Sequence, residues 1–148
     1  MLYRVRGLGG ASPQILARDL GRRTTPNGQL GGVVAAGEAL TQVTDLALYE
    51  PAPGIRKIYL AAFSSDRVGV VDATGDLPNA WPISARIGIA PVTGGANAMA
   101  GPRGLAVKYA RPLVPGDPGA RIYVLNRLDN SVSAIDPVSD ALVATFAL

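Results

Sequence analysis

The stretch RIYVLNRLDNSVSAIDP, from Arg121 to Pro137, consists of two short apolar runs on either side of a polar turn. The runs IYVL and VSAI are rich in Tyr and β-branched residues, which favour strands. The turn LDNS supplies Asp and Asn, which bond to their own backbone and tolerate the left-handed conformation. Pro137 has no N–H group and therefore ends the second run. The segment predicts a β-hairpin.

The hairpin has a second copy earlier in the chain. At an offset of 64 residues it aligns without gaps with IYLAAFSSDRVGVVDA, residues 58–73. Four of the sixteen positions are identical, and Asp66 stands where the later copy has Asn130. Both copies keep the same order of apolar run, polar turn, apolar run and terminal acid. We therefore interpret the hairpin as one copy of a repeat.

Each copy is flanked by two further apolar runs. Upstream lie TDLALY and RGLAVKY, each followed by a Pro/Gly turn, and downstream lie PISARIGI and ALVATFAL. The unit is thus four short strands in series, which is typical of a β-propeller blade with a period of about 40–45 residues. The longer period here is explained by two segments that have loop composition, residues 91–102 and 110–119.

These patterns predict an all-β chain that forms a partial β-propeller. Residues 43–90 form one four-stranded antiparallel blade, and residues 91–148 form a second blade that carries the Gly/Pro-rich insertions. Residues 1–42 fit less well and form an incomplete blade or an irregular segment. Within them, Ser12–Gly21 suits a helix of two turns, or a strand that follows Leu2–Arg6, and the strand is favoured.

Two blades and a remnant do not close a ring, because propellers need four or more blades. We therefore expect the chain to be a fragment of a larger protein, or to assemble with other copies. A small β-sandwich built from the same strands is the alternative closure.

The segment Arg121–Leu148 resembles the YVTN-type propeller repeat. In that repeat a Tyr-Val strand that ends in Asn precedes a turn, a Val-x-Val-Ile-Asp strand and a fourth strand like ALVATF. The likeness is looser over Lys57–Ala73, where Ala62 replaces Asn and Phe63 follows. The resemblance implies a bacterial propeller of the periplasm or cell surface. Its relatives would be surface-layer proteins, lactonase-like sugar enzymes and propellers attached to c-type cytochrome domains.

Composition excludes several kinds of site. The 148 residues contain no Cys and no His, so a thiolate nucleophile, a Ser-His-Asp site or a typical zinc site cannot be built within this chain. The net charge is only +3 and the arginines are scattered without stacking aromatics, which argues against nucleic-acid binding. No run of eighteen apolar residues predicts a membrane span, and the glycines and arginines near Met1 do not fit a signal peptide.

The acidic residues of the repeat are interpreted as structural. Asp72 and Asp136 occupy equivalent positions, which predicts a repeated backbone-capping role. Asp66, Asp129 and Asn130 have no calcium-loop spacing, so we assign them to hairpin turns. No catalytic, cofactor-binding or metal-binding residue is predicted.

Candidate interaction residues lie at the rim of the predicted propeller. Asn126 and Arg127 follow the strand that precedes the turn, and Asp129 and Asn130 belong to the turn itself. Trp81, the single Trp, is either an exposed anchor or a cover for a blade edge. The glycine-rich insertion, residues 91–102, is the favoured functional element, since insertions in repeat proteins gather on one face that often binds.

The function predicted is a non-catalytic propeller segment that serves as a binding scaffold. Its partner would be another protein or the remaining blades of the propeller. The alternative is a segment of a larger propeller enzyme, either redox-active with a c-type cytochrome domain or lactonase-like. That alternative requires His, Cys or clustered carboxylates elsewhere in the parent protein.

Overall fold

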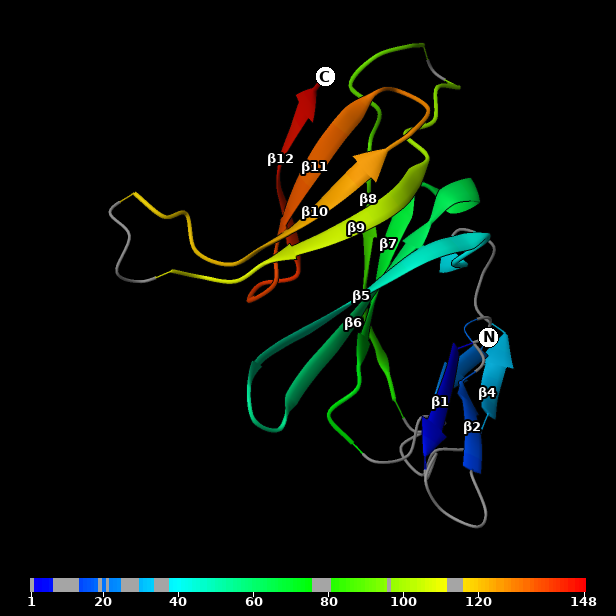
Figure 1. The fold of residues 1–148 in the computed structure, drawn as a ribbon. Coiled ribbons are helices and arrows are strands. Elements are labelled where there is room, and N and C mark those ends of the chain that lie inside the picture. Colours follow the sequence, from blue (N-terminus) through cyan, green and yellow to red (C-terminus); the bar gives the residue numbers. More distant parts are fainter. Residues whose placement is uncertain are drawn as a thin grey trace.

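The computed structural model describes residues 38–75, 81–95, 97–111 and 116–148, together with Leu20 and the backbone of four short N-terminal strands. These strands form two hairpins, β1 (Leu2–Arg6) with β2 (Gln14–Arg18) and β3 (Arg22–Thr24) with β4 (Leu30–Val33). The favoured strand within Ser12–Gly21 is thus confirmed at Gln14–Arg18. Both hairpins lie beside β5–β8, away from β10–β12 (Figure 1).

The rest of the described chain forms two four-stranded antiparallel sheets, with the strands of each in sequence order. The first sheet comprises β5 (Val43–Ala52), β6 (Ile55–Ala62), β7 (Arg67–Asp72) and β8 (Ile83–Gly88). The second comprises β9 (Pro102–Lys108), β10 (Arg121–Asn126), β11 (Ser131–Asp136) and β12 (Ala141–Ala147). The all-β fold and the two four-stranded sheets are as predicted, and neither sheet is closed (Figure 1).

The two sheets repeat one another residue by residue. All five residue pairs across β10 and β11 correspond to pairs across β6 and β7, 64 residues earlier. Tyr123 faces Ala134, for example, as Tyr59 faces Val70. A bulge interrupts the pairing with the fourth strand at the same place in both sheets, after Val70 and after Ala134. The repeat seen in the sequence is therefore a repeat of strand register.

Equivalent contacts also close the two units. Asp66 and Asn130 both end their turns with positive φ, 47° and 50°, as predicted for turn residues. Backbone hydrogen bonds of 2.8–3.1 Å then join matching atoms: Phe63 N to Gln42 O and Ile89 N to Asp66 O in the first unit, Arg127 N to Gly101 O and Leu148 N to Asn130 O in the second.

The unit length is conserved although the loops differ. These hydrogen bonds define units of 42–89 and 101–148, which are 59 residues apart at both ends, whereas the hairpins inside them are 64 apart. The connection between the first two strands is five residues longer in the second unit, and the connection between the last two is five residues shorter. Both of these connections lie at the same end of their sheet, opposite the β6–β7 and β10–β11 turns.

The two carboxylates that end the third strands cap the backbone as predicted. Asp72 Oδ1 accepts a hydrogen bond from Thr74 N at 3.0 Å, and Asp136 Oδ1 accepts one from Val138 N at 2.9 Å. Each satisfies an N–H group just beyond the end of the ladder, where no strand partner is present.

The main core lies between the sheets. One face of the first sheet packs against the opposite face of the second sheet, because successive side chains of a strand point to alternate sides. The principal buried residues are Tyr59, Val68, Val70 and Ile87 from the first sheet and Ile122, Val124 and Ile135 from the second. A second cluster covers the far face of the first sheet and consists of Leu20, Leu60, Val71, Ala73 and Trp81, with Leu40 packed against it.

The first strands of the two sheets, β5 and β9, lie side by side (Figure 1). Asp45 Oδ2 accepts a hydrogen bond from Leu105 N at 2.8 Å. The rings of Tyr49 and Tyr109 stack with centroids 5.5 Å apart. The sheets are therefore fastened along this edge as well as through the core.

A polar contact joins the β11–β12 turn to the first sheet. The Tyr59 hydroxyl donates to Asp140 Oδ1 at 2.7 Å, and Lys57 Nζ donates to Asp140 Oδ2 at 2.8 Å. Burial, together with the bond to Asp140, raises the pKa of Tyr59 above its usual range. The phenol therefore stays protonated and remains a donor to the carboxylate.

Asp117 holds the β9–β10 connection. Its carboxylate pairs with Lys108 and accepts hydrogen bonds from the N–H groups of Arg111 and Gly119 at 2.8 and 2.9 Å. The bond from Lys108 is the main cause that keeps the pKa of Asp117 well below its usual range.

None of the helical segments in the described part of the chain is long and apolar enough to cross a membrane.

Asp117→Asn should destabilise the fold in a pH-dependent way. Because the pKa of Asp117 is lower in the folded chain, its charge stabilises the fold above the unfolded value of about 3.9, and this contribution is lost as the pH falls through the folded value. Urea unfolding should show a lower midpoint for the variant at neutral pH and a shrinking difference in acid. Asp72→Asn, which keeps an acceptor for Thr74 N, is the control. A difference that is the same at both pH values would contradict the assignment.

Candidate interaction surface

The β10–β11 turn brings together four of the five residues predicted for interaction, but it orients them differently. Arg127 and Asn130 are exposed in the turn. Asn126, the last residue of β10, is completely buried, and Asp129 is nearly so. Only Arg127 and Asn130 therefore present their side chains to a partner.

Asn126 does not lie on the surface as expected. Strand alternation places it on the same face of β10 as Val124, which points to the first sheet. Its Nδ2 donates to Ser131 Oγ at 2.9 Å and to Ser133 Oγ at 2.8 Å, and Ser133 Oγ lies 3.0 Å from Thr145 Oγ1. Asn126 therefore links β10 to β11, and Ser133 extends this buried polar network to β12.

Asp129 connects the turn to the glycine-rich insertion. Its Oδ1 accepts a hydrogen bond from Ser131 Oγ at 2.8 Å, and its Oδ2 accepts one from Val92 N at 2.9 Å. At the other end of the insertion, Asp66 Oδ1 accepts a bond from Gly101 N at 2.8 Å. One turn carboxylate from each sheet thus holds one end of the insertion.

Gly101 is required at the second of these anchor points. Its φ is +63°, a conformation that side chains rarely adopt. A Cβ atom there would also lie 2.7 Å from the Leu128 side chain and 2.9 Å from that of Phe63. The insertion therefore enters β9 between the two hairpin turns without room for a side chain.

Exposed residues of the turn and of the two anchored ends of the insertion are here named the turn-end surface. It consists of five exposed residues: Val92, Met99, Arg127, Leu128 and Asn130. Their backbones are joined through the Val92–Asp129 bond and through the bond from Leu128 N to Ala100 O, which is 3.0 Å long. Apolar side chains beside an arginine have the composition found at the centres of protein interfaces.

Trp81 lies apart from this surface. It is 5% exposed and packs with Leu60 and Val71 on the far face of the first sheet. Its Nε1 donates to Gly75 O at 2.6 Å. This position does not fit an exposed anchor, and Trp81 covers a face of the sheet rather than the blade edge that was the alternative prediction.

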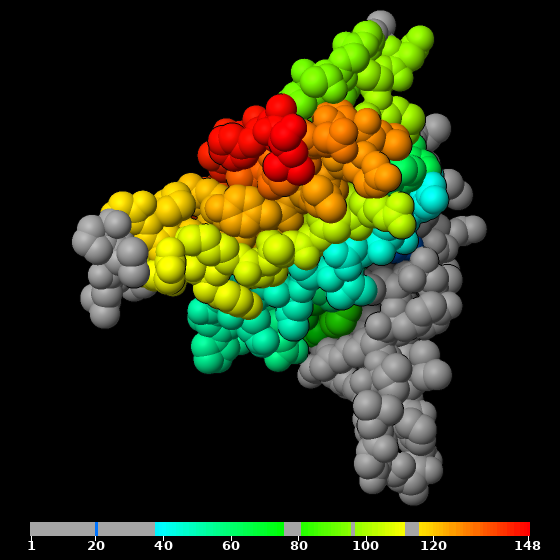
Figure 2. Space-filling model, turned by 45° about the horizontal axis from the view of Figure 1, so that its top comes forward, coloured from blue at the N-terminus to red at the C-terminus, as the bar shows by residue number. Residues whose placement is uncertain are grey.

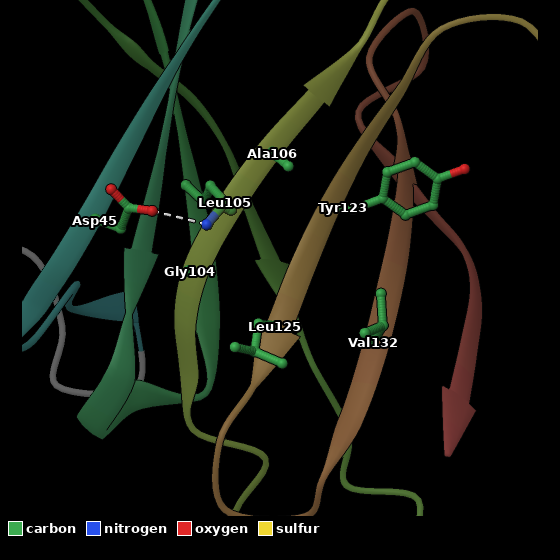
Figure 3. A pocket seen from close by; sticks show the side chains of 7 residues that line it. All are labelled: Asp45, Gly104, Leu105, Ala106, Tyr123, Leu125 and Val132. Carbon is green, nitrogen blue, oxygen red and sulfur yellow. Dashed lines mark hydrogen bonds between the residues drawn. The ribbon is translucent and has the colours of Figure 1, made fainter. Parts of the chain in front are cut away.

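The outer face of the second sheet is an apolar surface that lies outside the predicted interaction residues. Tyr123, Leu125 and Val132 point to this side, above Gly104 and Ala106, and line a shallow hollow of about 310 Å³ (Figure 3). Figure 2 shows the strands of this sheet side by side on the surface, from β9 in yellow-green to β12 in red. Leu125 is 44% exposed and Phe146, on β12, is 56% exposed.

The signal for this face was present in the strand pattern. The segment IYVL is apolar at successive positions, so both faces of β10 are apolar. Such a pattern is typical of a strand covered on both sides. Both surfaces offer non-covalent contact, and among the residues that the structure describes no group of three or more metal-ligating side chains is placed to hold an ion.

Asp129→Ala should loosen the insertion. Removing the carboxylate leaves the Val92 N–H and the Ser131 hydroxyl without their acceptor, which should lower the free energy of unfolding by about 1–3 kcal/mol. Hydrogen exchange should become faster at residues 92–95 than in the wild-type chain. Asn130→Gly is the matched control, because glycine adopts the positive φ there readily and the change should stay within about 0.5 kcal/mol. Unchanged exchange in Asp129→Ala would contradict the anchoring role.

Comparisons with protein-family models, with curated proteins and with solved structures find no match for this chain. The resemblance of Arg121–Leu148 to the YVTN-type repeat therefore stays a prediction from the sequence.

Proposed function

We propose that the chain is a pair of β-propeller blades that acts as a non-catalytic scaffold for protein binding. The observation that carries this proposal is the way in which the two equivalent sheets pack. The first sheet uses the face that contains Tyr59 and Val70, and the second uses the opposite face, with Ile122 and Ile135. The first-sheet equivalent of Ile122 is Ile58, which faces away from the second sheet.

Packing of unlike faces favours a propeller over a closed sandwich. When equivalent sheets pair through like faces, the contact is complete after two sheets. When they pair through unlike faces, each sheet has one face for its predecessor and one for its successor, and the arrangement continues. The side-by-side position of β5 and β9 agrees with first strands that gather around a common axis.

The turn-end surface is the proposed binding site for a protein partner. Its two backbone segments are fixed before binding by the buried carboxylate of Asp129 and the half-buried carboxylate of Asp66, which reduces the entropy lost when a partner docks. Leu128 and Val92 supply apolar contact area, and Arg127 supplies a charge and five hydrogen-bond donors. The fitting partner is a protein surface with an apolar patch beside a carboxylate.

A double variant of the turn-end surface tests this function. Proteins captured by the immobilised wild-type chain would be purified, and their Kd would be measured against the wild-type chain and against R127A/L128S. We expect binding to weaken by about tenfold or more, because central apolar and arginine contacts dominate interfaces. Circular dichroism should stay unchanged, since both side chains are exposed.

The matched control for this test is Val138→Ser, which alters a side chain 81% exposed in the β11–β12 turn. This turn lies at the opposite end of the second sheet. Equal binding by the wild-type chain, R127A/L128S and the control would rule out the turn-end surface as the binding site.

A further inference from the structure

The outer face of the second sheet has an exact register counterpart that is already covered. This open face carries Tyr123, Leu125, Val132, Ala134 and Phe146, of which Leu125 and Phe146 are exposed and the small Ala134 is buried. Their counterparts in the first sheet are Tyr59, Ala61, Val68, Val70 and Ile87, all of them buried, and the second sheet packs against this face. The open face is therefore the surface onto which this fold packs a neighbouring sheet.

We propose that the open face receives a further four-stranded unit of this same repeat, packed on the second sheet as the second is packed on the first. The inference deepens the proposed blade architecture and rests on it. The incoming unit would present a face like that of Ile122, Val124 and Ile135, with small and β-branched aliphatic side chains that fill the hollow beside Tyr123.

A polar contact specifies this occupant further. In the existing interface, Asp140 of the second unit accepts hydrogen bonds from Lys57 and Tyr59 of the first. The equivalents of these donors on the open face are Arg121 and Tyr123. The incoming unit therefore carries an acidic residue in the turn between its third and fourth strands. Gly104 stands in the position of Asp45, so the bridge that Asp45 makes to β9 is not repeated.

A second copy of this chain does not offer the matching face. The counterparts of Ile122, Val124 and Ile135 in the first sheet are Ile58, Leu60 and Val71. In the folded chain these residues are packed beneath Leu20, Leu40 and Trp81. A second copy would have to displace this cluster before it could dock in the same way.

A tandem chain tests the proposal directly. Leu148 N closes the second unit as Ile89 N closes the first, so a copy of residues 90–148 joined after Leu148 enters at the point where the existing connection leaves. The chain contains no Cys, so Leu125→Cys in the original second unit provides a single thiol on the open face. Ile55→Cys, at a site 49% exposed in the β5–β6 hairpin, is the matched control.

We expect the appended unit to protect position 125 alone. Thiol labelling of L125C should be slower in the tandem than in the single chain by about tenfold or more, because labelling then requires local opening. Labelling of I55C should be the same in both. The tandem without cysteine should also melt at least about 5 °C above the single chain.

The acidic contact has its own variant. Asp140→Ala in the appended copy should speed the labelling of L125C in the tandem by several-fold, whereas Val138→Ser in the same turn should leave it unchanged. Equal effects of the two substitutions would overturn the assigned chemistry of the incoming turn.

Three results would overturn the proposal as a whole. One is a tandem that labels at L125C as fast as the single chain, whether or not circular dichroism shows that the appended unit folds. Another is a single chain that is dimeric by light scattering and becomes monomeric on Leu125→Asp, since the face would then serve a second copy. A third is protection at both L125C and I55C. None of these results alters binding at the turn-end surface, so failure here is separable from failure of the scaffold function.

Discussion

The contact between opposite faces of two equivalent sheets is the constraint on which the rest of this structure depends. A strand buried on one side needs apolar residues at every second position, whereas a strand buried on both sides needs them throughout. The segment LAAF and the run VGVV satisfy the stricter condition in the first sheet, which is covered by the second sheet on one side and by Trp81 and Leu20 on the other. In the second sheet the run IYVL of β10 satisfies it too, but among the residues that the structure describes this sheet is packed against a neighbouring sheet on one side only.

Carboxylates near the ends of the strands satisfy backbone N–H groups that the sheets leave without a partner. Backbone N–H groups in the turns and in the insertion have no ladder partners, and groups of this kind are costly to bury. Asp129 and Asp66 accept those of Val92 and Gly101 in the insertion, and Asp136 accepts that of Val138 in the β11–β12 turn. Asp66 and Asp129 thereby also fix the connection between the sheets, so the same hydrogen bonds satisfy backbone groups and join the two units.

Much of the fold could be predicted from the sequence because its signals are local. The strands, the turn at Asn130 and the caps at Asp136 follow from residue types within a few positions, and the repeat follows from their order. The direction of Asn126 could also have been derived, since it shares the inward parity of Ile122 along β10. The contact of Tyr59 with Asp140 could not, because the two residues are 81 positions apart and neither has an unusual neighbourhood.

The positions of Trp81 and of the open face needed the three-dimensional arrangement. Trp81 precedes a proline and does not belong to an alternating apolar pattern from which its burial could be inferred. Its cluster includes Leu20, which lies in the N-terminal segment where the repeat pattern is weakest. The apolar character of Tyr123 and Leu125 was visible, but only the register with Tyr59 and Ala61 shows which kind of surface they form.

The exchange of five residues between the two hairpin connections at one end of each unit has a consequence for how such a protein can change. Because one connection lengthens while the other shortens, both units still begin and end 59 residues apart and close with the same hydrogen bonds. The lengths of these hairpin loops can thus change without altering the segment that connects one unit to the next. Insertions can accumulate there, altering shape and chemistry at one pole of the molecule, while the opposite pole keeps the joints between sheets unchanged.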